Sequence, residues 1–345
     1  MTVQNRRWLL AKRPVGMIKD TDFDRRNEAV PDPKDGEFLV RVTHLSFDPT
    51  QRPWMSRDTY VPAIPIGGVV RAAGAGQVVK SRNPNFKEGE LVQGSFGWQD
   101  YIVTNGTTDI MPVTKLPAGV SPEQALGIFG ITGLTAYFGL TDVGKPSAGD
   151  TVVVSGAAGA TGSVVVQLAK ALGCTVIGIA GGSEKCRWVV EQAKADAAID
   201  YKRENVAARI KELAPKGVNI VFENVAGEIL DASLQNLALR ARIVLCGGIS
   251  GYNADDPNET IGIRNYLLLI GRRARMEGFI ILDYAPRFGE AVEALSKLIA
   301  RGALKTPVDL QEGFENIPST MRRLFEGKNI GKQLLKIADP PLARN

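Results

Sequence analysis

The chain has 345 residues, of which 44% are hydrophobic and 23% are charged. With roughly 150 residues per domain as a guide, this length predicts about two domains, each with enough apolar residues to bury a core. Lys and Arg number 42 against 37 Asp and Glu, and a net charge of +5 spread over the chain excludes intrinsic disorder. The positive surplus is compatible with an anionic partner, either nucleic acid or a phosphorylated small molecule.

The cysteines and the single histidine limit which disulfides and metal sites the chain can form. Cys174, Cys186 and Cys246 lack CxxC spacing, which excludes a disulfide scaffold and argues against a Cys-rich zinc site. The single histidine, His44, cannot build a His-rich metal site, so no metal is expected. His44 lies in FLVRVTHLSF, whose alternating apolar residues indicate a half-buried strand, and a structural or surface role is favoured.

No apolar run approaches the roughly eighteen residues that a membrane span needs. The first residues also lack the apolar stretch of a signal peptide. Together with the unpaired cysteines, these features predict a cytoplasmic protein with no membrane partner.

The first third of the chain has the pattern of an all-β domain. Short alternating apolar runs, punctuated by Gly and Pro, occupy residues 38–47, 66–79, 91–103 and 111–120. Such runs predict strands joined by turns. We therefore expect a barrel-like β domain here.

From Thr151 onward, strand-like and helix-like segments alternate. The predicted strands are 151–156, 175–182, 197–201, 219–225 and 242–248, and the predicted helices are 163–172, 184–193, 206–214, 229–239 and 288–301. The strand segments are almost continuously apolar, as in strands buried on both faces. This alternation predicts an α/β domain with a doubly wound parallel sheet.

The chain after Gly302 does not continue this alternation. Residues 317–327 are helical in pattern and residues 332–337 are strand-like. We expect this tail to return to the β domain, which makes the α/β unit an insertion within it.

A glycine-rich turn follows the strand TVVVSG. Gly156, Gly159 and Gly162 are spaced by three residues and lead into a helical pattern. Glycines let a pyrophosphate approach the backbone, and the helix start directs N–H groups and its positive dipole end toward the phosphates. The turn therefore predicts dinucleotide binding. The alternative is a turn that only allows close packing of helix and strand.

The end of the next strand indicates which dinucleotide. An Asp or Glu there would bind the ribose 2′-hydroxyl of NAD, but this strand ends in Gly181, Gly182 and Ser183. Lys185 is placed to meet a 2′-phosphate, so NADPH is favoured over NADH. The alternative for Lys185 is an ordinary exposed helical lysine.

Several segments together carry a family resemblance. They are SFDPTQRPWMS, GLTAYFGL, VSGAAGATGSVVVQLAK, GGSEK, IDYK, ENVAGEILD, CGGISGYN, MEGFI and NIGKQLLKI. In their order and spacing the chain resembles the zinc-independent medium-chain dehydrogenase/reductases, in particular the prostaglandin and leukotriene reductases, plant double-bond reductases and bacterial curcumin reductase. The resemblance covers nearly the whole chain.

The resemblance implies a Rossmann-type sheet inserted in a GroES-like β domain. It implies a GroES-like substrate domain at residues 1–127, an NADP-binding domain at 128–305 and a return at 306–345, with the cleft between the domains and a homodimer that pairs the α/β domains. The cofactor-binding residues that it implies are Gly159, Ala160, Thr161, Gly162, Gly181, Lys185, Tyr201, Asn224, Cys246, Gly247, Ile249, Ser250, Tyr252, Phe279 and Asn329.

Two departures from related sequences matter. Zinc-dependent relatives carry a Cys and a Gly-His-Glu stretch where this chain has Asp48 and residues 66–68, so the resemblance also implies that no metal is bound. Closer relatives usually read DPYMR where this chain has Thr50 in place of the tyrosine, so an aromatic wall of the substrate cleft is absent. The substrate is therefore left open.

Without zinc to polarise an alcohol, hydride delivery to an electron-poor double bond is the favoured reaction. This predicts an enone or enal reductase, in which Tyr252 and the ribose hydroxyl of the cofactor supply hydrogen bonds or a proton. A turn tyrosine that only packs against the cofactor is the alternative for Tyr252.

Two other functions stay open. The first is an NADPH quinone reductase. The second is a non-catalytic NADPH-binding or RNA-associated protein, because of the arginine pairs at 272–273 and 322–323. These pairs are more typical of solvated faces, so we expect no nucleic acid partner.

Overall fold

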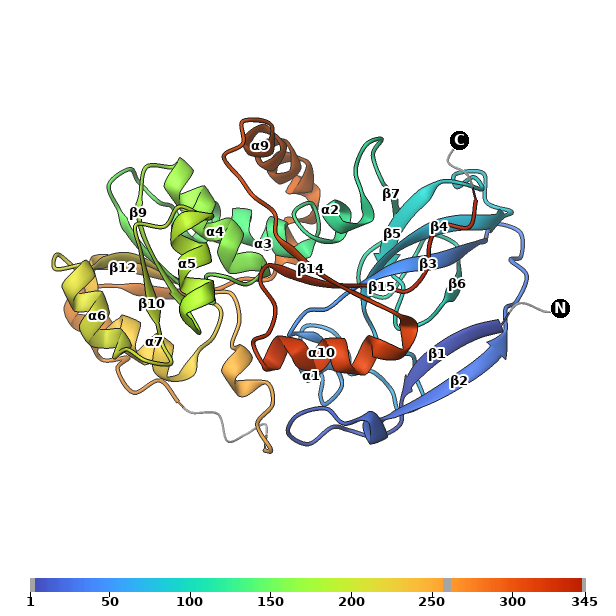
Figure 1. Cartoon of the computed structure of the whole chain (residues 1–345), viewed down its shortest axis with the longest axis horizontal. Helices are drawn as coiled ribbons and strands as arrows, with labels where there is room; N and C mark the ends of the chain where they lie inside the picture. Colours follow the sequence, from blue (N-terminus) through green and yellow to red (C-terminus); the bar gives the residue numbers. More distant parts are fainter. Residues whose placement is uncertain (1–3, 257–261, 343–345) are drawn as a thin grey trace. The chain divides into compact units, whose positions relative to one another are not determined.

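The computed structural model describes residues 4–256 and 262–342, which form two compact units (Figure 1). The first, the β unit, comprises residues 1–126, 309–328 and 333–345, and the second, the α/β unit, comprises 127–308 and 329–332. The C-terminal tail thus returns to the β unit, except for a short piece that belongs to the α/β unit. The domain limits predicted at 127/128 and 305/306 stay a prediction, because a division into compact units does not define what folds independently.

The β unit contains a seven-stranded sheet and a two-stranded sheet. The larger sheet has the order β14-β15-β3-β4-β5-β7, with β6 paired to β3, and the smaller one is β1-β2. The strands are β1 (Gln4–Leu10), β2 (Phe23–Ala29), β3 (Phe38–Ser46), β4 (Ala73–Ser81), β5 (Leu91–Ser95), β6 (Tyr101–Thr104), β7 (Thr114–Lys115), β14 (Val308–Glu312) and β15 (Lys332–Lys336). The helices are α1 (Gln51–Trp54), α2 (Pro122–Leu126) and α10 (Ile317–Phe325).

Strand β3 is buried on both faces, so the prediction of a half-buried strand is wrong. It pairs with β4, β6 and β15, and its register with β4 shifts between Val42 and His44. Such a bulge moves the core-facing positions from Val42 to Leu45. His44 does not belong to this core cluster. Helix α2 lies against it: Nε2 of His44 is 3.4 Å from a carboxylate oxygen of Glu123. His44 is only 4% exposed.

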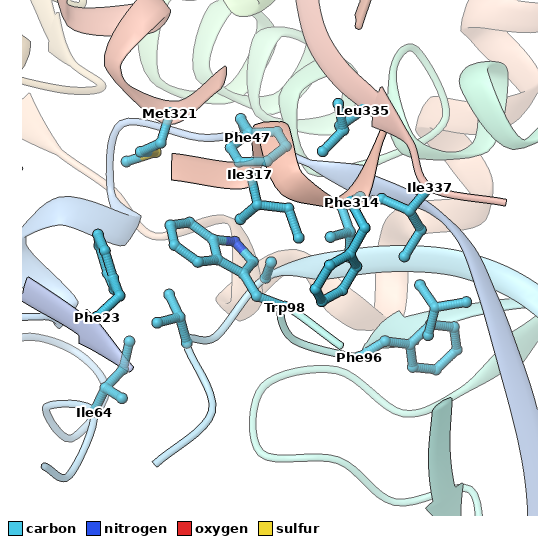
Figure 2. Packing of buried hydrophobic residues seen from close by; sticks show 14 of the residues in the cluster. Phe23, Phe47, Ile64, Phe96, Trp98, Phe314, Ile317, Met321, Leu335 and Ile337 are labelled. Atoms are coloured by element: carbon cyan, nitrogen blue, oxygen red, sulfur yellow. The ribbon is translucent and has the colours of Figure 1, made fainter. Parts of the chain in front are cut away.

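The core of the β unit is built around Trp98, which is fully buried (Figure 2). Its ring lies 5.2 Å from Phe23 and 6.0 Å from Phe47, measured between ring centroids. Side chains from the C-terminal tail complete the same cluster: Phe314, Ile317, Met321, Leu335 and Ile337. Burial of these apolar groups explains why the tail returns here.

The α/β unit has a six-stranded sheet with the order β10-β9-β8-β11-β12-β13, in which every strand pair is parallel. The strands are β8 (Thr151–Ser155), β9 (Thr175–Ala180), β10 (Ala197–Asp200), β11 (Val218–Glu223), β12 (Leu237–Leu245) and β13 (Arg275–Gly278). The helices are α3 (Ile131–Phe138), α4 (Ala160–Ala171), α5 (Ser183–Glu191), α6 (Val206–Leu213), α7 (Gly227–Leu234), α8 (Leu268–Arg272) and α9 (Phe288–Ala300).

Both faces of this sheet are buried, as predicted. On β8, Val152 and Val154 belong to one apolar cluster, and Val153 belongs to another on the opposite face. The chain first builds β8, β9 and β10 outward and then crosses back to start β11 beside β8. The ends of β8 and β11 therefore form the topological switch point, where open α/β sheets bind ligands.

The helix predicted at 229–239 is too long at its C-terminal end. Helix α7 ends at Leu234, and Leu237 already pairs with Val218 as the first residue of β12. In the turn after the helix, the side-chain amide of Asn236 donates to the carbonyls of Ala207 at 2.9 Å and Ala232 at 3.1 Å. The apolar residues that suggested helix are those of a buried strand.

No helix in the described part of the chain is long and apolar enough to cross a membrane.

Candidate dinucleotide-binding site

The glycine-rich turn joins β8 to α4. Gly156 has a φ of +60°, which favours glycine, and Gly159 is the N-cap of α4. A Cβ on Gly162 would lie 2.3 Å from the Gly156 carbonyl oxygen, so only glycine fits there. The first turn of α4 contains Ala160 and Thr161, and backbone N–H groups of a first turn lack acceptors within the helix. This geometry suits a pyrophosphate.

Residues 329–332 lie against this turn. The Gly331 N–H donates to the Ala158 carbonyl at 2.7 Å, and the Asn329 side-chain amide donates to the Gly331 carbonyl at 2.9 Å. Asn329 is 8% exposed. The structure thus places Asn329 in the α/β unit, beside the glycine-rich turn.

Gly181 and Tyr201 meet at the end of β9, and Lys185 follows in the next helix. A Cβ on Gly181 would lie 2.8 Å from the Tyr201 ring, so the ring rests on the glycine backbone. Tyr201 is 46% exposed, and Lys185 lies in the first turn of α5, which starts directly after this loop. A Cβ on Gly181 would also lie 3.0 Å from Cε of Lys202. Lys202 is a second lysine near this loop, and it was not identified from the sequence.

Asp200, at the end of β10, was also missed. Its carboxylate accepts hydrogen bonds from the backbone N–H groups of Gly182 at 2.8 Å and Lys202 at 3.1 Å. The bond from Gly182 holds the pKa of Asp200 below its usual range. This acid is thus engaged in shaping the loop after β9, and the IDYK segment was the signal for it.

The turns after β11 and β12 are tied together. The Asn224 side-chain amide donates to the Ser155 carbonyl at 2.7 Å, and its backbone carbonyl accepts from the Ile249 N–H at 3.3 Å. The Ser250 hydroxyl donates to the Val225 carbonyl at 2.6 Å. Three predicted residues, Asn224, Ile249 and Ser250, therefore belong to one network at the switch point.

Cys246, Gly247 and Tyr252 continue this segment. Burial, reinforced by the neighbouring Glu223, raises the pKa of the Cys246 thiol to about 12, so the thiol stays protonated at neutral pH. The Gly248 N–H donates to the Tyr252 hydroxyl oxygen at 3.1 Å. A Cβ on Gly247 would lie 3.6 Å from that oxygen. The tyrosine hydroxyl therefore lies over the glycine turn after β12.

Phe279 follows β13 and lies outside this hydrogen-bond network. A Cβ on Gly139 would be only 2.5 Å from the Phe279 ring, so the glycine makes room for the phenylalanine. Tyr284 packs edge-on at 6.2 Å between ring centroids, and it stacks in turn on Phe138 at 4.7 Å. Packing alone holds the Phe279 ring.

The described residues contain no group of three or more His, Cys, Asp or Glu side chains that could hold a metal ion. At the position that the resemblance assigns to a zinc-ligand cysteine, Asp48 accepts a hydrogen bond from the Ser46 hydroxyl at 2.6 Å. The expectation that no metal is bound stays a prediction.

Comparisons with known proteins agree with this architecture. Residues 6–113 match the N-terminal domain of an oxidoreductase family, and residues 160–297 match the family described as zinc-binding dehydrogenase. The NADPH-dependent curcumin reductase of Escherichia coli (strain K12) is 37% identical over 97% of this chain and 97% of its own length. The 2-alkenal reductase (NADP(+)-dependent) of Nicotiana tabacum is 36% identical over 97% of this chain and 98% of its own. A crystal structure of CurA in complex with NADPH from Vibrio vulnificus superimposes with a TM-score of 0.91, at 39% identity over 97% of this chain and 100% of that one.

The chain belongs to the medium-chain dehydrogenase/reductases, in the subgroup of NADP-dependent alkenal, curcumin and prostaglandin reductases. It is an NADP-dependent oxidoreductase with a Rossmann-type sheet inserted in a GroES-like domain.

Proposed function

We propose that this protein reduces the carbon–carbon double bond of an α,β-unsaturated ketone or aldehyde with NADPH. The observation that carries the proposal is full-length similarity to a 2-alkenal reductase and a curcumin reductase, because a 2-alkenal is an α,β-unsaturated aldehyde. The expected cytoplasmic location and the small-molecule partner belong to the same proposal.

The glycine cradle and the groups around Gly181 fit NADPH. Gly159 to Gly162 would bind the pyrophosphate through backbone N–H groups, and Lys185 and Tyr201 would hold the 2′-phosphate. When bound, NADPH supplies a hydride to the β-carbon of the substrate, and a proton added at the α-carbon completes the reduction. The substrate carbonyl carries the negative charge in between and needs a hydrogen-bond donor.

Tyr252 is the proposed donor. Its hydroxyl oxygen accepts from the Gly248 N–H, which fixes its position, and a phenol can donate its hydrogen to an enolate oxygen. The turn that holds Tyr252 is joined to Asn224 through Ile249. This couples the proposed donor to the cofactor-binding turns.

The test compares acceptors and a matched variant. We expect NADPH oxidation with 2-alkenals or ring enones, and a loss of turnover of about a hundredfold for Tyr252→Phe with little change in NADPH affinity. Equal losses of turnover and of NADPH affinity would identify Tyr252 as a cofactor contact. Unchanged turnover would identify it as a structural residue. Faster turnover of quinones than of enones would favour a quinone reductase. RNA retention that weakens with salt, without any turnover, would favour the non-catalytic alternative.

We also propose a homodimer that pairs the α/β units through β13. This strand is an edge of the sheet in the described chain, and Arg275 and Glu277 lie on it. Nε of Arg275 is 3.6 Å from a carboxylate oxygen of Glu277. An antiparallel pairing about Met276 would set Arg275 opposite Glu277 of the partner subunit. Tyr266, at 56% exposure, and Ile270, at 73%, are apolar groups from the segment that precedes β13 and would be covered.

A further inference from the structure

Glu223 is a buried acid at the topological switch point. It is the last residue of β11, and its side chain is fully buried. A buried carboxyl group in a sheet interior costs free energy unless hydrogen bonds compensate it. Glu223 belongs neither to the glycine-rich turn nor to the predicted cofactor-binding residues.

One oxygen of this carboxyl group gathers three donors. Oε1 accepts from the Ser155 hydroxyl at 2.7 Å, the Val225 N–H at 2.6 Å and the Ala226 N–H at 2.8 Å. The Ser155 oxygen in turn accepts from the Asn224 N–H at 2.8 Å. The end of β8 and the turn after β11, which are far apart in sequence, are thus joined through one acid.

The same turn supports the segment after β12. The N–H groups of Ile249 and Ser250 donate to the carbonyls of Asn224 and Val225, at 3.3 and 3.1 Å. The Glu223 backbone carbonyl accepts from the Cys246 N–H at 2.9 Å. Loops from three neighbouring strands therefore depend on the position of residues 223–225.

The backbone of this turn is strained where the acid holds it. Ala226 has a φ of +67°, a region that residues with a Cβ rarely adopt. Such a conformation costs free energy and persists only where surrounding interactions impose it. Here the Glu223 carboxyl group fixes the N–H of Ala226 itself.

We propose that Glu223 is a positioning residue for NADP(H), which locks the turns after β8, β11 and β12 into the arrangement that presents Asn224 and residues 246–252 to the cofactor. The inference rests on the proposed cofactor site. The residue acts through the turns that it ties together.

The second carboxyl oxygen explains why an acid is needed there. Oε2 of Glu223 is buried and has no hydrogen-bond partner among the described residues. Burial raises the pKa of Glu223, and the hydrogen bonds from Ala226, Ser155 and Val225 oppose this shift. Glutamine would keep the acceptor but place two N–H donors where the described structure offers no acceptor, and unmade bonds of buried donors are costly.

The experiment measures NADPH binding directly, by nicotinamide fluorescence in the absence of any substrate. For Glu223→Gln we expect the Kd for NADPH to rise about ten- to a hundredfold, with a smaller effect on kcat at saturating NADPH. Asp150→Asn is the matched control, because Asp150 also caps a backbone N–H, that of Ser147, but at the opposite end of β8. We expect it to lower thermal stability and leave the Kd within about threefold.

Equal losses of stability in both variants with an unchanged NADPH Kd would overturn the inference, since Glu223 would then be merely structural. If Glu223→Gln does not fold, Ser155→Ala carries the test, because it removes the hydroxyl that links the acid to β8 and should also weaken NADPH binding. Wild-type protein that binds NADPH but turns over no enone would contradict the proposed reaction alone. Wild-type protein that binds no NADPH would overturn both.

Discussion

At the scale of single residues, we propose that the loop after β9 decides the choice of cofactor. Asp200 is bound to the N–H groups of Gly182 and Lys202, so its charge serves the backbone of this loop. Tyr201 and Lys202 lie against Gly181, and Lys185 lies in the first turn of the helix that follows. In the proposed site, a 2′-phosphate would meet cationic and phenolic groups there.

The first prediction concerns Lys185. We expect Lys185→Ala to weaken NADPH binding about ten- to a hundredfold, because a charge-assisted contact contributes roughly 1.5–3 kcal/mol, and to change NADH binding little. Titration of both cofactors measures this, with Lys211→Ala on α6 as a control for the loss of an exposed lysine. Equal affinities for the two cofactors in the unmutated protein would contradict the assignment.

The second prediction concerns His44, the single histidine of the chain. Burial lowers the pKa of its imidazole from the usual 6.5, although the nearby Glu123 opposes this shift. The folded state therefore prefers the neutral ring, and its contribution to stability is complete above pH 6.5 and is lost as the pH falls toward the lowered pKa.

Between pH 7.5 and 5, the thermal unfolding midpoint of the wild type should fall because this contribution to stability is lost. The midpoint of His44→Gln should fall less. The imidazole proton resonances report the same titration without overlap from other histidines. Identical pH slopes for the two proteins would mean that His44 does not contribute.

At the scale of elements, the start of α4 depends on contact between two parts of one turn. Gly162 lies on the first turn of the helix and faces the Gly156 carbonyl. The approach is closer than any side chain allows, so Gly162 is needed for packing of the turn against the helix. Its part in binding a pyrophosphate stays a prediction.

We expect Gly162→Ala to displace the turn, lowering the thermal midpoint and weakening NADPH binding at least tenfold, since the new Cβ would lie 2.3 Å from a backbone oxygen. The matched control is Gly289→Ala near the start of α9, where a Cβ would meet nothing within 4 Å. That exchange should stabilise the protein by about 0.5–1 kcal/mol, because alanine is the better helix former. Equal effects of the two exchanges would contradict the packing argument.

At the scale of the whole molecule, two compact units share one chain that leaves the β unit and returns to it. The returning tail supplies Phe314, Ile317 and Leu335 to the β core, and residues 329–332 to the α/β unit. Neither unit is therefore complete without the tail.

The proposed dimer is tested at this scale. Ile270→Arg should shift the protein from dimer toward monomer in sedimentation or light-scattering measurements, because it sets a charge into an apolar contact. Val15→Arg, at an exposed apolar position of the β unit, is the control and should leave the mass unchanged. A monomeric wild type would contradict the proposal.

Metal independence is the remaining prediction. We expect activity to survive exhaustive chelation and elemental analysis to find no stoichiometric zinc, because no described cluster of His, Cys, Asp or Glu could hold it. Loss of activity on chelation that zinc restores would show that a metal is required.

The sequence by itself determined the α/β alternation, the doubly wound sheet, the glycine-rich turn and the absence of an acid at the end of β9. These features are local, because strand and helix periodicity and turn chemistry involve residues close together in the chain. The same locality explains the failures: the apolar start of β12 suggested helix, and the sheet of β1 and β2 was not predicted, since its polar, Arg-rich strands show no clear apolar alternation.

Only the tertiary structure decided which distant groups meet. Ser155 and Glu223 are 68 positions apart, and Gly182 and Asp200 are 18 apart, yet each pair is joined by a hydrogen bond. Gly139 and Phe279 likewise meet only through packing of the folded unit. Such pairings depend on the order of strands in the sheet, and the periodicity of a single segment carries no information about which strand will become its neighbour.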